Sequence, residues 1–331
     1  DHRSSFEFCE NGAKAFATEA SKKRVTPEKM REISVTSLSK LSDMELDKMG
    51  RITNPLFLKE GEDTYEEIDW GSAFKIIASK INGSDDPDEN VLYTSGRASN
   101  EAAFLWGVLA RQIGTNNLPD CSNMCHESSG VALSESIGIE KGTVKLSCFE
   151  KADLILVIGQ NPGTNHPRML TALAACKENG GSVVSINPLE ETAMKRFKHP
   201  QNPLHLIGRG VQIADEHLPV RIGGDAALLQ GFAKTILSQG GADLDFISAN
   251  TLGFEDWKKH IESTDWEKIV EQSGISRDRI EKTGNAIAKS ERMIVCWAMG
   301  LTQHENSVAV IQEVSNLLLA GGHFGKPGAG A

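Results

Sequence analysis

Short apolar segments alternate with amphipathic helical patterns over most of the chain. Three of them are almost continuously apolar, at Leu154–Ile158, Ser182–Ile186 and Met293–Ala298. A repeated order of apolar strand, glycine-containing turn and helix is typical of a parallel β-sheet covered by helices on both faces. The sequence therefore predicts the α/β fold class, with doubly wound α-β-α domains.

Weaker local signals predict further elements. Val91–Thr94 has the composition of a short buried strand, and Val220–Ile222 that of a strand leading into a helix over Ala226–Ser238. Near the start, Asn11–Arg24 has a helical pattern that would turn Phe16 inward. These segments would extend the α/β pattern to both sides of the three stronger strands.

Unusual polar clusters directly follow the predicted strands. Parallel strands place their carboxyl ends on one edge of the sheet, where turns and helix N-termini meet and ligands bind. Such an edge suits a long polar ligand that carries phosphate, although glycine turns follow strands in many α/β folds. The clusters are Gly96-Arg97, Gly159–His166, Asn187-Pro188, Gly223–Asp225 and Gly300–Gln303.

Charge and cysteine content limit the partners. With 35 basic and 45 acidic residues the formal charge is −10, which argues against nucleic acid or an anionic membrane surface. The six cysteines lack the spacing of a small disulfide scaffold and suit a reducing compartment, so we expect a cytoplasmic protein. No apolar run approaches the ~20 residues that a membrane helix needs.

Cys125 and His126 are neighbours in a turn-forming stretch that precedes a helical pattern. The N-terminus of a helix favours a thiolate, which is a soft ligand suited to a redox metal. The adjacent imidazole could donate or accept a proton. Two alternatives stay open from the residues alone: a buried structural cysteine with an ordinarily hydrogen-bonded histidine, and a zinc site that also uses Cys121.

The glycine patterns of the common nucleotide sites are absent. No turn reads Gly-x-Gly-x-x-Gly, and no stretch reads Gly-x-x-x-x-Gly-Lys-Ser/Thr. An ordinary NAD dehydrogenase is therefore disfavoured, and a dinucleotide would have to rest its phosphates on the strand-end turns in another way.

Six stretches, in this order and spacing, resemble one known superfamily. They are Tyr93–Glu101, Gly114–Asn117, Asp120–His126, Gly159–Pro167, Gly300–His304 and Gly325–Gly330. Together they resemble the molybdopterin-guanine-dinucleotide oxidoreductases of the formate dehydrogenase and dimethyl sulfoxide reductase type. The likeness is greatest to the soluble formate-dehydrogenase-like alpha subunits.

The resemblance implies roles for individual residues. Cys125 matches the position that binds molybdenum, and His126 matches a neighbouring histidine that accepts a proton during catalysis. Asp225 matches a carboxylate that reads the guanine edge. Family members often carry Asp and Arg where this chain has Asn187 and Leu189. The residues expected to contact the pterin dinucleotide are Gly159, Asn161, Thr164, Asn187, Asp225, Met299, Gly300 and Gln303.

The resemblance also implies cofactors and a division of the chain. The cofactors would be Mo-bis(molybdopterin guanine dinucleotide) and a [4Fe-4S] cluster whose cysteines would precede Asp1. Residues 1–52 would form a small N-terminal helical segment, 53–119 the first half of an α/β domain, and 120–331 a second, dinucleotide-binding α/β domain. We therefore expect a piece that is incomplete at both ends and binds at most one dinucleotide.

The implied function is a two-electron oxidation or reduction of a small-molecule substrate by a formate-dehydrogenase-like enzyme with an electron-transfer partner. The alternative is a non-catalytic scaffold or interaction subunit that keeps the same fold.

Overall fold

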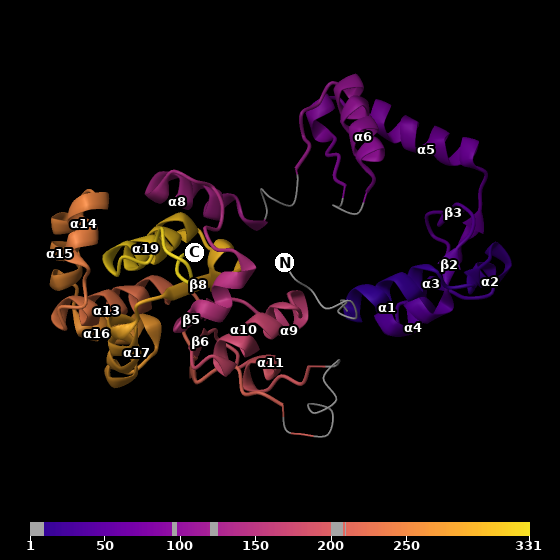
Figure 1. The fold of residues 1–331 in the computed structure, drawn as a ribbon. Coiled ribbons are helices and arrows are strands. Elements are labelled where there is room, and N and C mark those ends of the chain that lie inside the picture. Colours follow the sequence, from indigo (N-terminus) through magenta and orange to yellow (C-terminus); the bar gives the residue numbers. More distant parts are fainter. Residues whose placement is uncertain (1–9, 95–97, 120–124, 200–207, 209) are drawn as a thin grey trace. The chain divides into compact units, whose positions relative to one another are not determined.

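The computed structural model describes residues 10–94, 98–119, 125–199, 208 and 210–331. The chain divides into two compact units, residues 4–120 and residues 121–331 (Figure 1). Each unit has its own secondary structure.

The second unit is built on a four-stranded sheet in the order β7-β6-β5-β8. Its strands are β5 (Leu154–Ile158), β6 (Ser182–Ile186), β7 (Glu216–Leu218) and β8 (Met293–Trp297). All three pairings are parallel, and Leu154 at the start of β5 aligns with Ser182 and Met293. The predicted α/β fold with a parallel sheet is confirmed.

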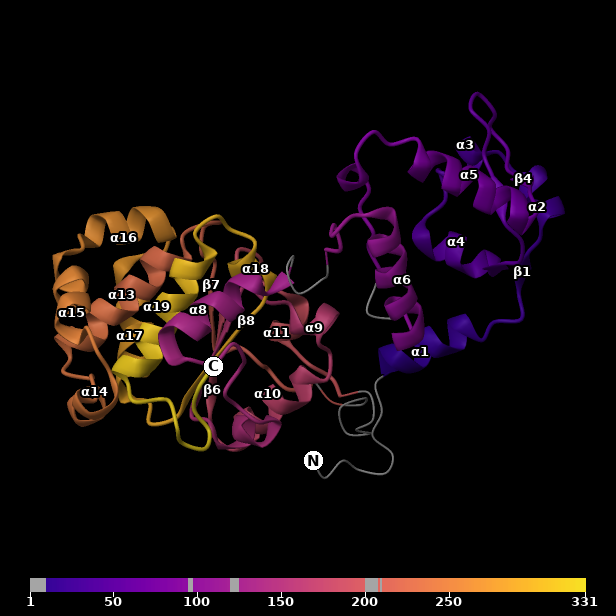
Figure 2. The same ribbon diagram turned by 90° about the horizontal axis from the view of Figure 1, so that it is seen from above.

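Helices cover both faces of this sheet (Figure 2). On one face, α8, α13, α17 and α19 bury their apolar residues against the sheet, and α10 and α11 do so on the other. The helical segments of the unit are α8 (Glu127–Ile137), η2 (Leu146–Lys151), α9 (Pro162–Asn165), α10 (Met169–Glu178), α11 (Thr192–Lys195), α13 (Asp225–Ser238), α14 (Leu244–Asn250), α15 (Phe254–Ser263), α16 (Trp266–Ser273), α17 (Arg277–Lys289), α18 (Met299–Thr302) and α19 (Ser307–Ala320).

Strand β5 shows why the sheet needs continuous apolar runs. Successive side chains of a strand point to opposite faces. Leu154, Leu156 and Ile158 belong to the core under α13 and α19. Ile155 and Val157 belong to the core under α10. Because both faces are covered, every position of the strand is buried, and no alternation with polar residues remains.

In the described residues of the first unit the strands have two residues each, and they form two separate two-stranded sheets. Its helices α5 and α6 have Asp69 and Ser99 as N-caps, and each side chain accepts a backbone N–H of the first turn. The elements are α1 (Glu10–Glu19), β1 (Arg24–Val25), α2 (Pro27–Arg31), α3 (Val35–Leu38), α4 (Asp43–Met49), β2 (Arg51–Ile52), β3 (Leu56–Phe57), β4 (Glu66–Glu67), α5 (Trp70–Asn82), η1 (Pro87–Glu89) and α6 (Asn100–Ile113).

Three of the weaker predictions are wrong. Val91–Thr94 forms no strand, because none of the strands in the described residues of its unit pairs with it. Helix α1 ends at Glu19, and Phe16 is exposed rather than packed inward. The strand expected at Val220–Ile222 lies earlier, at β7, whose residues pair with β6.

Within the described part of the chain, no helix combines the length and the apolarity needed to cross a bilayer.

Candidate active site

The connections that follow β5 and β8 diverge at the carboxyl edge of the sheet. After β5 the chain continues into α10, which packs on one face, and after β8 it continues into α19, which packs on the opposite face. The two strands are neighbours in the sheet. When connections diverge in this way, the ends of the strands flank a topological switch point, where ligands of open α/β sheets bind.

The turns after β5 and β8 meet at Gly159 and Gly300. The Gly300 N–H donates to the Gly159 carbonyl over 3.0 Å. Gly159 has a φ of +57°, and a Cβ added there would lie 2.7 Å from the Gly300 Cα. Both positions therefore require glycine for backbone packing alone, and this requirement adds to any role they have in holding a ligand.

Asn161 is the N-cap residue of the short helix α9, which follows Gly159 and contains Thr164. The Asn161 side-chain oxygen accepts the Thr164 backbone N–H over 3.2 Å and caps this helix. Asn187 follows β6, and its amide donates to the Leu189 carbonyl over 3.0 Å. These polar side chains fix the conformation of their own turns on the carboxyl edge.

Asp225 is the first residue of α13 and is only 7% exposed. Burial raises the pKa of its carboxyl group to about 6, and the nearby His304 imidazole opposes this shift. His304 follows α18, so the beginning of α13 lies near the turn after β8. Donors that reached the Asp225 carboxylate would stabilise its charged form.

Met299 and Gln303 lie in that same turn, at the beginning of α18 and directly after it. Both side chains are exposed. The structure thus places all eight predicted cofactor-binding residues at the carboxyl ends of the four parallel strands or in the turns that follow them.

Cys125 and His126 lie at the start of α8, where His126 is the N-cap residue and Cys125 is half-buried. The His126 Nδ1 lies 3.1 Å from the Ser129 hydroxyl. That hydroxyl also accepts the indole N–H of Trp297, the last residue of β8, over 2.9 Å. The start of α8 is therefore attached to the carboxyl end of β8 and lies at the same edge as the turns.

The cysteines of the described residues differ in their environment. Burial raises the pKa of the Cys176 thiol to about 11 and that of the Cys296 thiol to about 12, so both remain thiols at neutral pH. Of the four described cysteines, Cys176 is buried, and Cys125, Cys148 and Cys296 are half-buried. Among the residues described, no three His, Cys, Asp or Glu side chains gather into a metal site. Cys121, required by the zinc alternative, lies outside the described residues.

A cavity of about 370 Å³ lies beside the His126–Ser129–Trp297 group. Gln160 lines it, is buried, and has its side-chain nitrogen 3.2 Å from the His166 Nδ1. Ser129, Gln160 and Trp297 were not predicted as site residues. The signal that could have found Gln160 is its position directly after Gly159, at the end of a buried strand.

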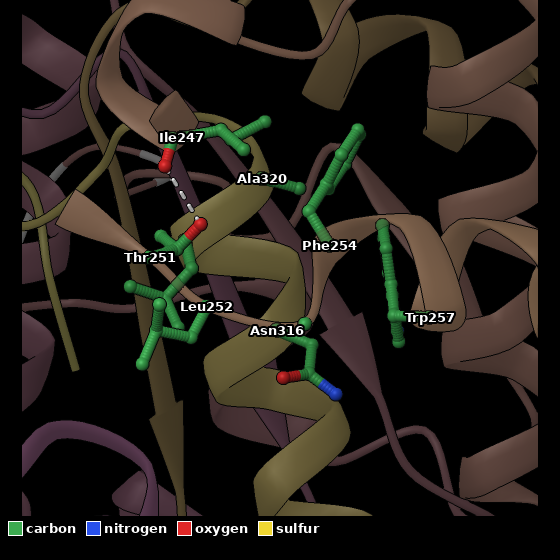
Figure 3. Close-up of a pocket in the computed structure, with 9 residues that line it drawn as sticks. Ile247, Thr251, Leu252, Phe254, Trp257, Asn316 and Ala320 are labelled. Carbon is green, nitrogen blue, oxygen red and sulfur yellow. Dashed lines mark hydrogen bonds between the residues drawn. The ribbon is translucent and has the colours of Figure 1, made fainter. Parts of the chain in front are cut away.

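A second hollow lies far from this edge. In Figure 3 Ile247, Leu252, Phe254 and Trp257 surround a space of about 80 Å³ beside the end of α19. Helix α19 is followed by His323, whose ring accepts the N–H of Met293, the first residue of β8. This hollow is thus near the amino edge of the sheet, and no titratable side chain lines it.

Comparisons with known proteins agree with this architecture. The family model for molybdopterin oxidoreductase matches residues 51–331. The chain belongs to the molybdopterin oxidoreductase family, and membership implies a molybdenum–pterin cofactor.

Relatives and a solved structure show how far the likeness extends. The chain is 47% identical over 330 residues to an uncharacterized oxidoreductase of Mycobacterium tuberculosis (strain ATCC 25618 / H37Rv), covering 98% of this chain and 42% of that protein. It is 28% identical over 281 residues to the F420-dependent formate dehydrogenase 2 subunit alpha of Methanococcus maripaludis, covering 85% of this chain and 39% of that protein. The structure of acetylene hydratase from Pelobacter acetylenicus matches in fold, with a TM-score of 0.67 at 20% identity over 98% of this chain and 39% of that one. The chain thus spans less than half the length of each.

Proposed function

We propose that this chain is part of a formate-dehydrogenase-like oxidoreductase that binds molybdenum through bis(molybdopterin guanine dinucleotide), and that the chain holds one of the two dinucleotides. One observation carries the proposal: the Cys125–His126 pair and the turns after the strands converge on the carboxyl edge of one parallel sheet. The formate dehydrogenase alpha subunit among the relatives supports the substrate class of small oxidisable molecules.

The residues at this edge fit such a group. A dinucleotide would rest its phosphates on strand-end turns, and the turn of Gly159 with the beginning of α9 lies beside the Gly300 turn at this edge. Asp225 is a buried carboxylate whose charged form is disfavoured until donors reach it. The N1–H and N2–H of guanine are suitable donors, because a carboxylate can accept both together.

Cys125 would supply a sulfur ligand to the metal, and the thiolate is a soft donor suited to a sulfur-rich coordination shell. When bound, the molybdenum–pterin group would supply the two-electron chemistry. This chain's own residues would orient that group and hold a proton at His126, whose Nδ1 is fixed by Ser129.

The proposal also covers the cellular location of the protein and its partner. We propose a cytoplasmic enzyme that passes electrons to a protein partner, and the formal charge of −10 argues against nucleic acid or an anionic membrane surface as a partner. The four described cysteines are free thiols, which suits a reducing compartment.

Metal analysis tests the proposal. The full-length protein, purified from cells supplied with molybdate, should contain molybdenum, and Cys125→Ser in it should abolish dye-linked substrate oxidation while the protein stays folded. Cys148→Ser, which changes another half-buried cysteine in η2, should leave activity nearly unchanged. Stoichiometric zinc without molybdenum or tungsten would contradict the proposal. Full activity of a metal-loaded Cys125→Ser protein would remove that residue from the site.

A further inference from the structure

The Ser129 hydroxyl connects two elements that are far apart in the sequence. It is 8% exposed and lies within hydrogen-bond distance of both His126 Nδ1 and Trp297 Nε1. His126 lies at the start of α8, and Trp297 lies at the end of β8. Serine in a helix commonly donates to the carbonyl four residues earlier. Ser136 on the same helix does so, to Ala132 over 2.7 Å, whereas Ser129 takes its partners from side chains.

The donors and acceptors of this group can be assigned. An indole N–H can only donate, so the Ser129 oxygen must accept from Trp297. The serine hydrogen then needs an acceptor, because a buried donor without one costs about 1–3 kcal/mol. Among the hydrogen bonds of the described residues, His126 Nδ1 is the acceptor available to it. Accepting from Trp297 also polarises the serine O–H and makes it a better donor.

We propose that Ser129, held by the Trp297 indole, is a positioning residue that keeps neutral His126 with its hydrogen on Nε2. The catalytic role of His126 in this inference rests on the proposed function, whereas the hydrogen bonds do not depend on it. The lone pair of Nδ1 is occupied by the Ser129 hydroxyl, and Nε2 is the ring nitrogen left for a ligand. His126 therefore offers a hydrogen-bond donor to whatever binds beside Cys125, not a free base.

This hydrogen-bond arrangement has a consequence for what the Nε2 atom of His126 can accept or donate. For Nε2 to accept a proton, the hydrogen of the neutral ring must first lie on Nδ1, with the Ser129 hydroxyl turned to accept it. Ser129 would then carry two incoming hydrogen bonds, and its own hydrogen would need another acceptor. Acceptance of a proton at Nε2 is therefore disfavoured, and what the neutral ring offers there is a donated hydrogen bond, which narrows the role that the sequence resemblance assigns to His126.

Nitrogen NMR of the cofactor-free chain tests the tautomer directly. At a pH above the ordinary imidazole pKa of about 6.5, the His126 signals, identified by their loss in His126→Gln, should show a protonated Nε2 and an unprotonated Nδ1. A protonated Nδ1 in the unmodified chain would overturn the proposal without any need for a variant at Ser129.

Acylation of the ring by diethyl pyrocarbonate tests the role of Ser129. This reagent attacks an imidazole nitrogen with a free lone pair, so exposed His126 should react slowly while Ser129 occupies Nδ1. Ser129→Ala should speed its modification about fivefold, the factor expected for the loss of one ordinary hydrogen bond. Ser129→Thr keeps the hydroxyl and should restore the slow rate.

Two further variants separate this role from general loosening of α8. Ser136→Ala removes a hydroxyl from the same helix and should not change the rate. Trp297→Phe removes the indole N–H together with the five-membered ring that carries it, leaves the Ser129 hydroxyl in place, and should raise the rate by less than Ser129→Ala does. Equal acceleration in Ser136→Ala, or none in Ser129→Ala, would overturn the proposal. These readouts use no metal, so their failure is distinct from a failure to find molybdenum.

Discussion

Helices α6 and α13 each have 14 residues but differ in how they are held. Nine residues of α13 are buried, whereas in α6 only Ala110 is. Helix α13 packs against a four-stranded sheet and against α17 and α19. The strands of the unit that contains α6 have two residues each. An amphipathic pattern therefore indicates which face a helix can bury, and that face is buried only where packing partners are present, as the sheet, α17 and α19 are for α13.

The capping of the two helices follows the same division. Ser99 caps α6 with its side chain, accepting the Ala102 N–H over 3.2 Å. Helix α13 begins after Gly224, which makes no side-chain cap, and its first residue is the buried Asp225. A helix without much buried surface depends on local signals, whereas a packed helix can place an unfavourable residue at a functional position.

The largest predicted difference comes from a pair of phenylalanines. Phe232 in α13 is 0% exposed, and Phe104 in α6 is 71% exposed. Phe232→Ala should lower the free energy of unfolding by about 3–5 kcal/mol, because it leaves a cavity in the core. Phe104→Ala should change it by no more than about 0.5 kcal/mol. Hydrogen exchange of the amides of α6 and α13 reports each unit separately, and equal effects would refute the comparison.

Two glycines provide the next contrast. Gly159→Ala should destabilise its unit by about 2–4 kcal/mol, through the positive φ and the collision with the Gly300 backbone. Gly61 in the first unit also has a positive φ, +84°, but an added Cβ would meet nothing within 4 Å. Gly61→Ala should therefore cost only about 1–2 kcal/mol.

Denaturant unfolding of the two variants measures this difference. A cost at Gly159 that did not exceed the cost at Gly61 would show that the turns after β5 and β8 can separate. The close approach of these turns would then not be required by the fold.

The strands most accessible to sequence reasoning were those buried on both faces. β5, β6 and β8 were located to within one residue, because a short continuous apolar run between turn-forming residues is typical of a strand covered by helices on both sides. β7 was misplaced because it is an edge strand with the sequence Glu-His-Leu. Its Glu216 is paired with Arg279 and Lys282 of α17, so the strand lacks an apolar run and depends on contacts far along the chain.

The candidate site divides in the same way. Cys125, His126 and the strand-end turns could be predicted because they are adjacent in the sequence or follow strands. Ser129 and Trp297 could not, since their hydrogen bond joins positions 168 residues apart. It forms only after α8 has packed against α19 beside the end of β8. The local sequence pattern can predict the reactive residues, whereas the side chains that orient them are determined by tertiary packing.

The smallest predicted effect concerns two aspartates whose pKa values shift in opposite directions. Burial raises the pKa of Asp225 from 3.8 to about 6. The protonated form is the one favoured in the fold, so its stabilising contribution is complete below pH 3.8 and is lost as the pH rises through about 6. At pH 7 the charged, buried carboxylate is a cost, and Asp225→Asn should raise the stability of the cofactor-free unit by about 2 kcal/mol.

Asp69, the exposed N-cap of α5, is the matched control. The Ser72 hydroxyl and backbone N–H groups lower its pKa, so its contribution is present above pH 3.8 and is lost as the pH falls below its folded value. Asn caps a helix about as well as Asp, so Asp69→Asn should change stability little at pH 7. Between pH 4 and pH 7 the free energy of unfolding should therefore depend less on pH in Asp225→Asn, and this dependence should not change in Asp69→Asn. If the N–H donors of guanine stabilise the charged form of the Asp225 carboxylate, Asp225→Asn should make the free protein more stable and weaken its affinity for guanine nucleotides. If Asp225→Asn gained stability but bound guanine nucleotides as tightly as before, the Asp225 carboxylate would be shown to destabilise the fold without taking part in nucleotide recognition.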